Sequence, residues 1–193
     1  MVEPNSFSSA PLFSVCALLK NYDPKGDSDQ EAARAAMLTL ATDGARVLFR
    51  SHFVPGHITV SSWLESPCGE YVLLHHHRKL DRWLQLGGHV DGDEDLVRAA
   101  RREILEESGI ADSALIVDGV FDLDIHPIPA TKSEPAHHHF DVRFLMRAGT
   151  AEIRCSDESH DIKWIPRDEV GLMTTEQSIA RMARKAKVIA RLS

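Results

Sequence analysis

Three glutamates lie close together in the segment 102–107, which reads REILEE. On a helix, Glu103 and Glu107 are four residues apart and Glu106 is three residues from Glu103, so the three carboxylates project to nearly the same side. At about 6 Å and an effective dielectric constant of about 20, each pair repels by roughly 3 kcal/mol, and by less in open water. A divalent cation relieves this repulsion, and Mg²⁺ and Mn²⁺ prefer carboxylate oxygens as ligands. The spacing therefore indicates a metal site.

Two opposite-charge pairs offer an alternative interpretation of the same helix. Glu94 and Arg98, and likewise Arg102 and Glu106, are spaced i, i+4. Such pairs are common on ordinary exposed helices. On the helix alone, a solvated charged face therefore competes with a metal site, and the flanking residues must decide.

Those flanking residues complete a longer pattern. From Gly88, five residues lead to Glu94, and seven more lead to the segment 102–110, which reads REILEESGI. Every fixed position of the Nudix box is matched, and seven fixed identities with two apolar positions arise by chance in such a chain with odds on the order of 10⁻⁷. The chain therefore resembles the Nudix hydrolase superfamily over Gly88–Ile110, and more loosely over about 57–170.

The resemblance implies a fold and a reaction. For residues 56–193 it implies the Nudix fold, an α/β/α sandwich with a mixed sheet. It also implies hydrolysis of a diphosphate linked to another moiety, often a nucleoside diphosphate. Residues 1–55 are predicted to form a helical N-terminal extension packed on that core. Within the extension, Ser28 and Glu31 form a capping box that starts a helix running to about Thr42.

The resemblance also implies roles for individual residues. Glu106 and Glu107 are expected to bind Mg²⁺, with Mn²⁺ as the alternative cation. Glu103 is a further ligand or a base, and the backbone carbonyl of Gly87 completes the metal site. Arg102, together with Glu94, is expected to orient the site and balance its charge.

The elements that position these residues follow from hydrophobic periodicity. A helix over 94–108, closed by Gly109, carries the glutamates, and Val97, Ala100 and Ile104 form its buried stripe. A last helix begins near Thr174. Apolar and β-branched runs predict strands over 58–63, 71–75, 114–125, 138–146 and 161–165.

A further acid is expected in the segment 157–161, DESHD. The enzymes that this chain resembles often recruit an acid from a loop between the later strands, as a metal ligand or as the base for the attacking water. Glu158 is the first choice, because it matches the acid that often precedes the tryptophan strand, here the strand of Trp164. Asp161 is the second, since strand alternation gives it the same facing as Lys163. A solvated acidic loop is the alternative.

Several of the 11 histidines are clustered, at 75–77, 126 and 137–139. On a strand, His137 and His139 share a face with Asp141. That spacing suits Zn²⁺ or Mn²⁺, or a substrate phosphate, whereas strand-end histidines bonded to carboxylates or water are the alternative. We place His137, His139 and Asp141 at the substrate pocket.

The net charge of the chain limits the classes of partner that it is expected to bind. Lys and Arg number 22 and Asp and Glu number 29, which gives a net charge of −7 with His neutral. An acidic chain is a poor binder of nucleic-acid polymers or anionic membranes, because phosphate binding needs clustered cations. The expected partner is a small-molecule diphosphate, and a homodimer is compatible with the sequence. The three cysteines are widely spaced and form no CxxC motif, which favours a reducing cytoplasm. No apolar run reaches the roughly 20 residues that a membrane span needs.

The leading hypothesis is a Mg²⁺-dependent pyrophosphohydrolase. ADP-ribose or another nucleoside diphosphate sugar is the first substrate to consider, and a nucleoside triphosphate is the second. An isopentenyl-diphosphate isomerase-like enzyme would share the fold, but no cysteine lies just before or within the box. A non-catalytic nucleotide sensor usually has a decayed box, whereas every carboxylate is intact here.

Overall fold

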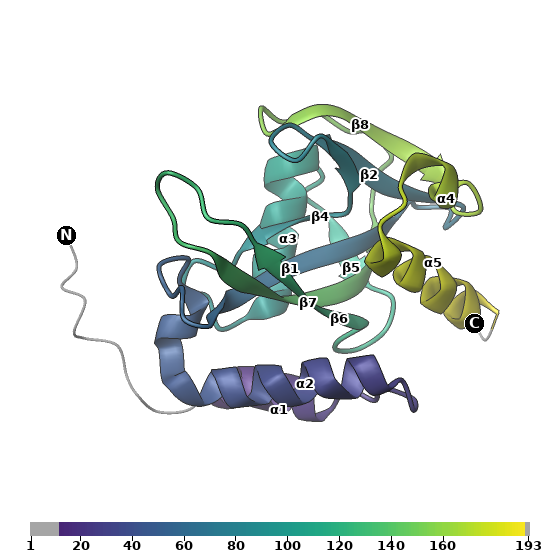
Figure 1. Cartoon of the computed structure of the whole chain (residues 1–193). Helices are drawn as coiled ribbons and strands as arrows, with labels where there is room; N and C mark the ends of the chain where they lie inside the picture. The colour runs from purple at the N-terminus through teal and green to yellow at the C-terminus, as the bar shows by residue number, and fades with distance from the viewer. Residues whose placement is uncertain (1–11, 192–193) are drawn as a thin grey trace. The chain divides into compact units, whose positions relative to one another are not determined.

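A computed structural model describes residues 12–191 (Figure 1). These residues fold into two compact units. The first comprises the described part of Met1–Val60, with Gly88–Ala99 and Gly119–Arg143; the second comprises Ser61–Gly87, Ala100–Asp118 and the described part of Phe144–Ser193. The elements are, in chain order, α1 (Phe13–Lys20), α2 (Ser28–Leu40), the 3-10 helix η1 (Ala41–Leu48), β1 (Gly56–Glu65), β2 (Tyr71–His77), β3 (Arg82–Leu84), β4 (Leu86–His89), α3 (Leu96–Ser108), β5 (Ser113–Leu115), β6 (Asp122–Ile128), β7 (His137–Ala148), β8 (Ser159–Pro166), α4 (Val170–Met173) and α5 (Gln177–Ala190).

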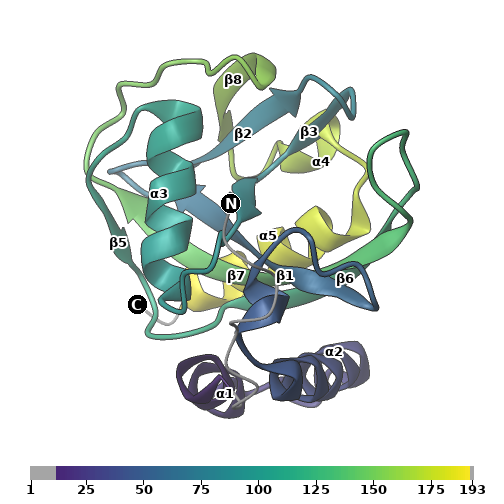
Figure 2. The same ribbon diagram turned by 90° about the vertical axis from the view of Figure 1, so that its left-hand side faces the viewer.

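In the first unit, the helices α1 and α2 lie side by side (Figure 1, Figure 2). The buried side chain of Gln30 ties α2 to β6. Its Nε2 donates to the carbonyl of Leu123 (2.7 Å), and its Oε1 accepts from the N–H of Leu123 (3.0 Å) and from the hydroxyl of Tyr22 (2.5 Å). Both ends of the buried amide are thus paired, and one side chain satisfies the strand backbone as a neighbouring strand would.

The eight-stranded sheet has the strand order β3-β2-β1-β7-β5, with β4 paired to β1, β6 to β7 and β8 to β2. The β2–β8 ladder is antiparallel and sets Leu73 opposite Trp164. In the second unit, buried apolar side chains of the strands, among them Trp63, Leu73 and Phe144, supply the core. Burial of such side chains contributes roughly 1.5–3 kcal/mol each.

Strands β1 and β7 run parallel to each other. The N–H of His138 donates to the carbonyl of Pro55 (3.0 Å), and further along both strands Ser62 Oγ lies 3.5 Å from Met146 Sδ. The residue numbers rise together on the two strands, as parallel pairing requires, whereas β2, β3, β5, β6 and β8 pair in the antiparallel sense. The sheet is therefore mixed, and the expected α/β class with N-terminal helices is confirmed.

Two local predictions are wrong. The single strand predicted over 114–125 is divided into β5 and β6, because residues 116–121 form a bend that includes Gly119 at φ +83°. The N-cap of α2 is Asp27 and not Ser28: Asp27 Oδ1 accepts from the N–H groups of Asp29 (3.0 Å) and Gln30 (3.1 Å). Asp and Ser are both good caps, so residue type alone did not distinguish these adjacent positions.

Two expectations about the rest of the chain can also be compared with the structure. Cys16, Cys68 and Cys155 are free thiols. Among the helices of residues 12–191, none has the length and apolar character that a membrane span requires.

The α2 cap can be tested by paired substitutions. Asp27→Ala should lower the free energy of unfolding by about 1 kcal/mol, because two N–H groups at the helix start lose their acceptor. Ser28→Ala should change it by less than about 0.5 kcal/mol. Urea unfolding followed by circular dichroism measures both. A larger loss in Ser28→Ala than in Asp27→Ala would return the cap to Ser28.

Candidate active site

Helix α3 has a defined start and end, which fixes the direction of its glutamates. At the start, Asp95 Oδ1 accepts from the N–H of Arg98 (3.0 Å). At the end, the N–H of Gly109 donates to the carbonyl of Leu105 (2.8 Å), with Gly109 at φ +77°. A side chain there would also meet Arg154, whose Nε lies 3.0 Å from an added Cβ. Glycine is the residue that commonly closes a helix in this conformation.

The buried side of α3 carries both apolar residues and acids. Ala100 and Ile104 are buried as predicted, but Val97 is only half-buried, and its place in the core is taken by Leu96 and Ala99. On the same side, Glu103 is 9% exposed and Glu107 4% exposed, whereas Glu106 is exposed. Two of the three predicted carboxylates are therefore removed from bulk water, which argues against the fully solvated face.

The carboxyl group of Glu107 contacts two polar groups. Its Oε2 accepts from the N–H of Gly87 (2.8 Å), and its Oε1 lies 3.6 Å from His75 Nδ1. Burial raises the pKa of Glu107 to about 8; the Gly87 N–H opposes that rise, and the charges of Glu103, Glu158 and Glu106 add to it. Without a cation, this carboxyl group therefore holds its proton near neutral pH.

Arg102 is the cation of the site. Its Nη1 lies 2.9 Å from Glu103 Oε1 and 3.3 Å from Glu106 Oε2. One guanidinium thus holds two of the three carboxylates in place, which agrees with the orienting role that the resemblance implies.

The other charge pair read from the sequence is not formed. Arg98 instead donates from Nη2 to Asp93 Oδ1 (2.6 Å) and from Nε to Asp93 Oδ2 (2.8 Å). Glu94 Oε2 accepts from Ser14 Oγ (3.0 Å). Glu94 precedes the first residue of α3, Leu96, so its spacing to Arg98 is not helical and the expected i, i+4 contact does not arise.

Glu158 lies in the turn just before β8, as predicted, and its side chain is exposed. Its carbonyl accepts from the N–H of Arg78 (2.9 Å), and its charge contributes to the raised pKa of Glu107. Asp161 is engaged elsewhere: its Oδ2 lies 2.5 Å from Lys163 Nζ, and this ion pair lowers the pKa of Asp161. The charge of Glu158 therefore acts on Glu107, whereas the carboxylate of Asp161 is paired with Lys163.

His75 is a site residue to which the sequence assigned no role. Its Nδ1 lies 2.7 Å from Ser159 Oγ, and burial lowers the pKa of His75 to about 4, with His77 and His76 adding to the effect. A neutral imidazole therefore stands beside the Glu107 carboxyl group. The available signal was a histidine that directly follows the apolar run 72–74 of β2.

The residues placed at the substrate pocket belong to the first unit. The rings of His137 and His139 contact each other, with centroids 5.3 Å apart. The carboxylate of Asp141 is held by buried Arg143 (Nε to Oδ2, 2.7 Å) and by Thr59 (Oγ1 to Oδ1, 3.1 Å). The structure therefore groups the two histidines and assigns Asp141 to an ion pair.

The sequence also missed His57, which lies against both of these histidines. Its ring centroid is 5.0 Å from that of His137 and 4.8 Å from that of His139. Burial lowers the pKa of His57 to about 4 and that of His139 to about 2, and neighbouring imidazoles add to both shifts. Nothing in the sequence spacing connects position 57 to 137–139, because β1 and β7 meet only in the folded sheet.

The raised pKa of Glu107 predicts how stability depends on pH in the metal-free protein. The folded-state pKa, about 8, lies above the ordinary value of 4.5, so the folded protein keeps a proton that the unfolded chain loses. Stability should therefore fall as pH rises from about 4.5 to about 8, by up to about 1.4 kcal/mol per pH unit from this group. Glu107→Gln should remove this contribution, and Glu106→Gln, at an exposed position, should keep it. Urea unfolding in EDTA at several pH values measures the slopes; equal slopes in wild type and Glu107→Gln would contradict the assignment.

Comparison with known proteins identifies the family of the chain. The family model for the NUDIX domain matches residues 55–191. The chain is 28% identical over 123 residues to bis(5'-nucleosyl)-tetraphosphatase (asymmetrical) from Rattus norvegicus, covering 64% of this chain and 77% of the rat protein. The fold resembles a C. elegans Ap4A hydrolase binary complex (TM-score 0.57, 18% identity, 70% of this chain and 98% of that one). It also resembles the NUDIX domain of Shewanella oneidensis NrtR complexed with ADP ribose (TM-score 0.51, 18% identity, 92% and 97%). With a complete box on α3 and a family match over most of its length, the chain belongs to the Nudix family of pyrophosphohydrolases, which act on nucleotide-linked substrates.

Proposed function

We propose that the chain is a Mg²⁺-dependent hydrolase that cleaves the pyrophosphate bond of a nucleoside diphosphate linked to another moiety. ADP-ribose or another nucleoside diphosphate sugar is the first substrate to test. The carboxylate group on α3 carries the proposal: Glu103 and Glu106 share one guanidinium, and Glu107 is buried beside a backbone N–H. Three glutamates and one arginine leave an excess of negative charge, which attracts a cation and repels a diphosphate that carries no cation.

The donor set fits Mg²⁺, with Mn²⁺ as the alternative. Glu103, Glu106 and Glu107 offer carboxylate oxygens, and Gly87, whose N–H already contacts Glu107, offers a carbonyl. The raised pKa of Glu107 supports the fit, because a buried carboxyl group that keeps its proton can exchange it for a cation. When bound, the cation would neutralise the diphosphate and lower the pKa of water.

The other residues of the site would have separate roles in the reaction. Arg102 keeps Glu103 and Glu106 in a fixed arrangement. Glu158 is our candidate for the base that accepts a proton from the attacking water, since it is exposed and its charge acts on Glu107. Neutral His75, between Ser159 and Glu107, adds no positive charge that would compete with a metal.

The substrate-binding proposal for His137, His139 and Asp141 rests on their common strand face. We do not expect Asp141 to contact the substrate directly, because its carboxylate is already hydrogen-bonded to Arg143 and Thr59.

A dinucleoside tetraphosphate is the second candidate substrate. The specific observation is the 28% identity to the rat tetraphosphatase over 77% of that protein. A nucleoside triphosphate remains the third. All three substrate classes contain a phosphoanhydride bond that a divalent metal and a base can hydrolyse, so the residues of the box are compatible with each of them.

Substitution of the metal-binding acids tests the reaction. Glu106→Gln and Glu107→Gln should each lower turnover by at least ~10²-fold, because each removes a metal ligand charge and retains the side-chain shape. The measurement is hydrolysis of ADP-ribose, a nucleotide sugar, a dinucleoside tetraphosphate and a nucleoside triphosphate with Mg²⁺ and with EDTA. Wild-type turnover that persists after exhaustive chelation, or in both variants, would refute the metal assignment. Mg²⁺-dependent cleavage of triphosphates alone would refute the diphosphate-linked substrate and leave the metal site intact.

The base is tested separately. Glu158→Gln should lower kcat by ~10²-fold with KM within a few-fold, since a base acts on the chemical step. Asp161→Asn, which breaks an exposed ion pair with Lys163, is the matched control and should retain kcat within a few-fold. A collapse in Asp161→Asn with full activity in Glu158→Gln would transfer the role to Asp161.

A further inference from the structure

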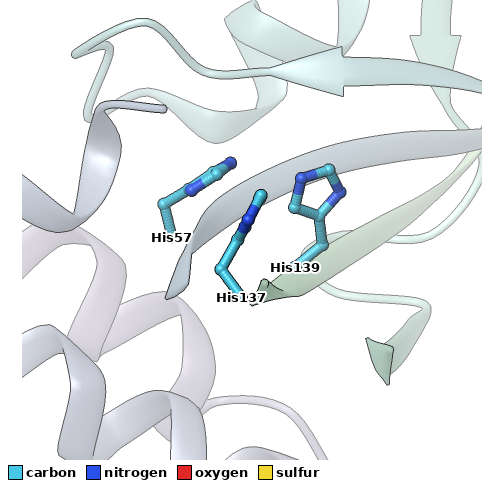
Figure 3. Close-up of side chains that lie close together, drawn as sticks. All are labelled: His57, His137 and His139. Atoms are coloured by element: carbon cyan, nitrogen blue, oxygen red, sulfur yellow. The ribbon is translucent and has the colours of Figure 1, made fainter. Parts of the chain in front are cut away.

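Three histidines lie close together in the first unit, at the starts of two parallel strands. His57 is in the first residues of β1, and His137 and His139 are in the first residues of β7 (Figure 3). Each offers one ring nitrogen, and these three atoms lie within 4.8 Å of one another. His57 is 1% exposed and His137 4% exposed. The group is separate in sequence from the acids of α3.

Backbone carbonyls orient two of these rings. His57 Nδ1 lies 3.2 Å from the carbonyl of His52, and His137 Nδ1 lies 2.9 Å from the carbonyl of Pro135. A carbonyl oxygen can only accept, so each Nδ1 must carry the hydrogen, and each Nε2 is left with a lone pair. Histidines that bind metals typically have this arrangement, in which one ring nitrogen donates to a backbone oxygen and the other faces the ion.

The Nε2 atom of His57 gives an independent indication of a ligand. It is buried, and it has no hydrogen-bond partner in the part of the chain that the structure describes. A buried polar atom without a partner costs free energy that native proteins rarely leave uncompensated. A cation that accepts lone pairs from several converging imidazoles would remove this cost.

We propose that His57, His137 and His139 form a Zn²⁺ site, distinct from the Mg²⁺ site of the box. Three neutral imidazoles suit Zn²⁺, whereas Mg²⁺ requires oxygen ligands. In a tetrahedral zinc site the ligand nitrogens lie about 3.3 Å apart, so modest rotations of the side chains bring the three rings into position. The fourth position is open to water or to an anionic oxygen.

The proposed ion would connect the starts of β1 and β7. These strands already meet there, because the N–H of His138 donates to the carbonyl of Pro55. Two further rings surround the group: the centroid of His89 is 5.1 Å from that of His57, and the centroid of His126 is 5.4 Å from that of His139. With His57, His137 and His139 they make a group of five neighbouring imidazole rings.

Zinc binding to protein without a polyhistidine tag tests the proposal. We expect one Zn²⁺ per chain in competition titrations with a chromophoric chelator, and an intense visible spectrum with Co²⁺, as four-coordinate nitrogen sites give. His57→Ala and His139→Ala should each weaken Zn²⁺ binding by at least ~10²-fold. Two controls should bind as wild type: His138→Ala, at an exposed position on the same strand, and Glu106→Gln, in the box.

The outcomes separate the two sites. Zn²⁺ binding that is lost in Glu106→Gln and kept in both histidine variants would overturn the proposal, as would wild-type binding no tighter than that of His139→Ala. Circular dichroism of each variant identifies any that fails to fold, and His137→Gln replaces a variant that does. Hydrolysis of a nucleotide substrate by wild type has no bearing on this result, so the proposed function and the zinc site can fail independently.

Discussion

A carboxyl group buried at the end of α3 is the constraint on which the candidate active site depends. Glu107 is 4% exposed, and the neutral groups around it, the N–H of Gly87 and the ring of His75, stabilise a negative charge only in part. Its pKa is therefore raised, and the second unit contains an acid that is ready to exchange a proton for a cation. Three segments act on this one group. Gly87 donates a hydrogen bond to it, His75 of β2 lies beside it, and the charge of Glu158, in the turn before β8, raises its pKa.

Arg102 determines how the other two acids behave. Because its guanidinium contacts both Glu103 and Glu106, these carboxylates can lie on one helix face without the full cost of their mutual repulsion. A single arginine among three acids thus lowers their repulsion and leaves the negative charge that the proposed metal binding requires.

The parts of this structure that the sequence predicted are those encoded by local spacing. The direction of Glu103, Glu106 and Glu107 follows from helix geometry, and the end of α3 follows from Gly109. The parts that it did not predict depend on contacts between distant segments. His57 lies beside His137 only because β1 and β7 pair, and Arg98 bonds to Asp93 instead of Glu94 in a structure where α3 begins only at Leu96. Two good cap residues in succession, Asp27 and Ser28, likewise cannot be ranked without the backbone conformation.

The two clusters of ligand atoms in this chain differ in chemistry, and that difference would keep their metals apart. The box offers carboxylate and carbonyl oxygens, which hold hard cations that retain much of their water. The histidine group offers imidazole nitrogens, which hold borderline cations such as Zn²⁺ in a four-coordinate geometry. Mg²⁺ therefore gains little from the imidazoles of His57, His137 and His139. Zn²⁺ can also bind carboxylates, but Mg²⁺ at the proposed box site would compete for those oxygens and not for the three nitrogens. With both proposed sites filled, a chain with a net charge of −7 would use one cation to hold a phosphate and another to hold two strands together.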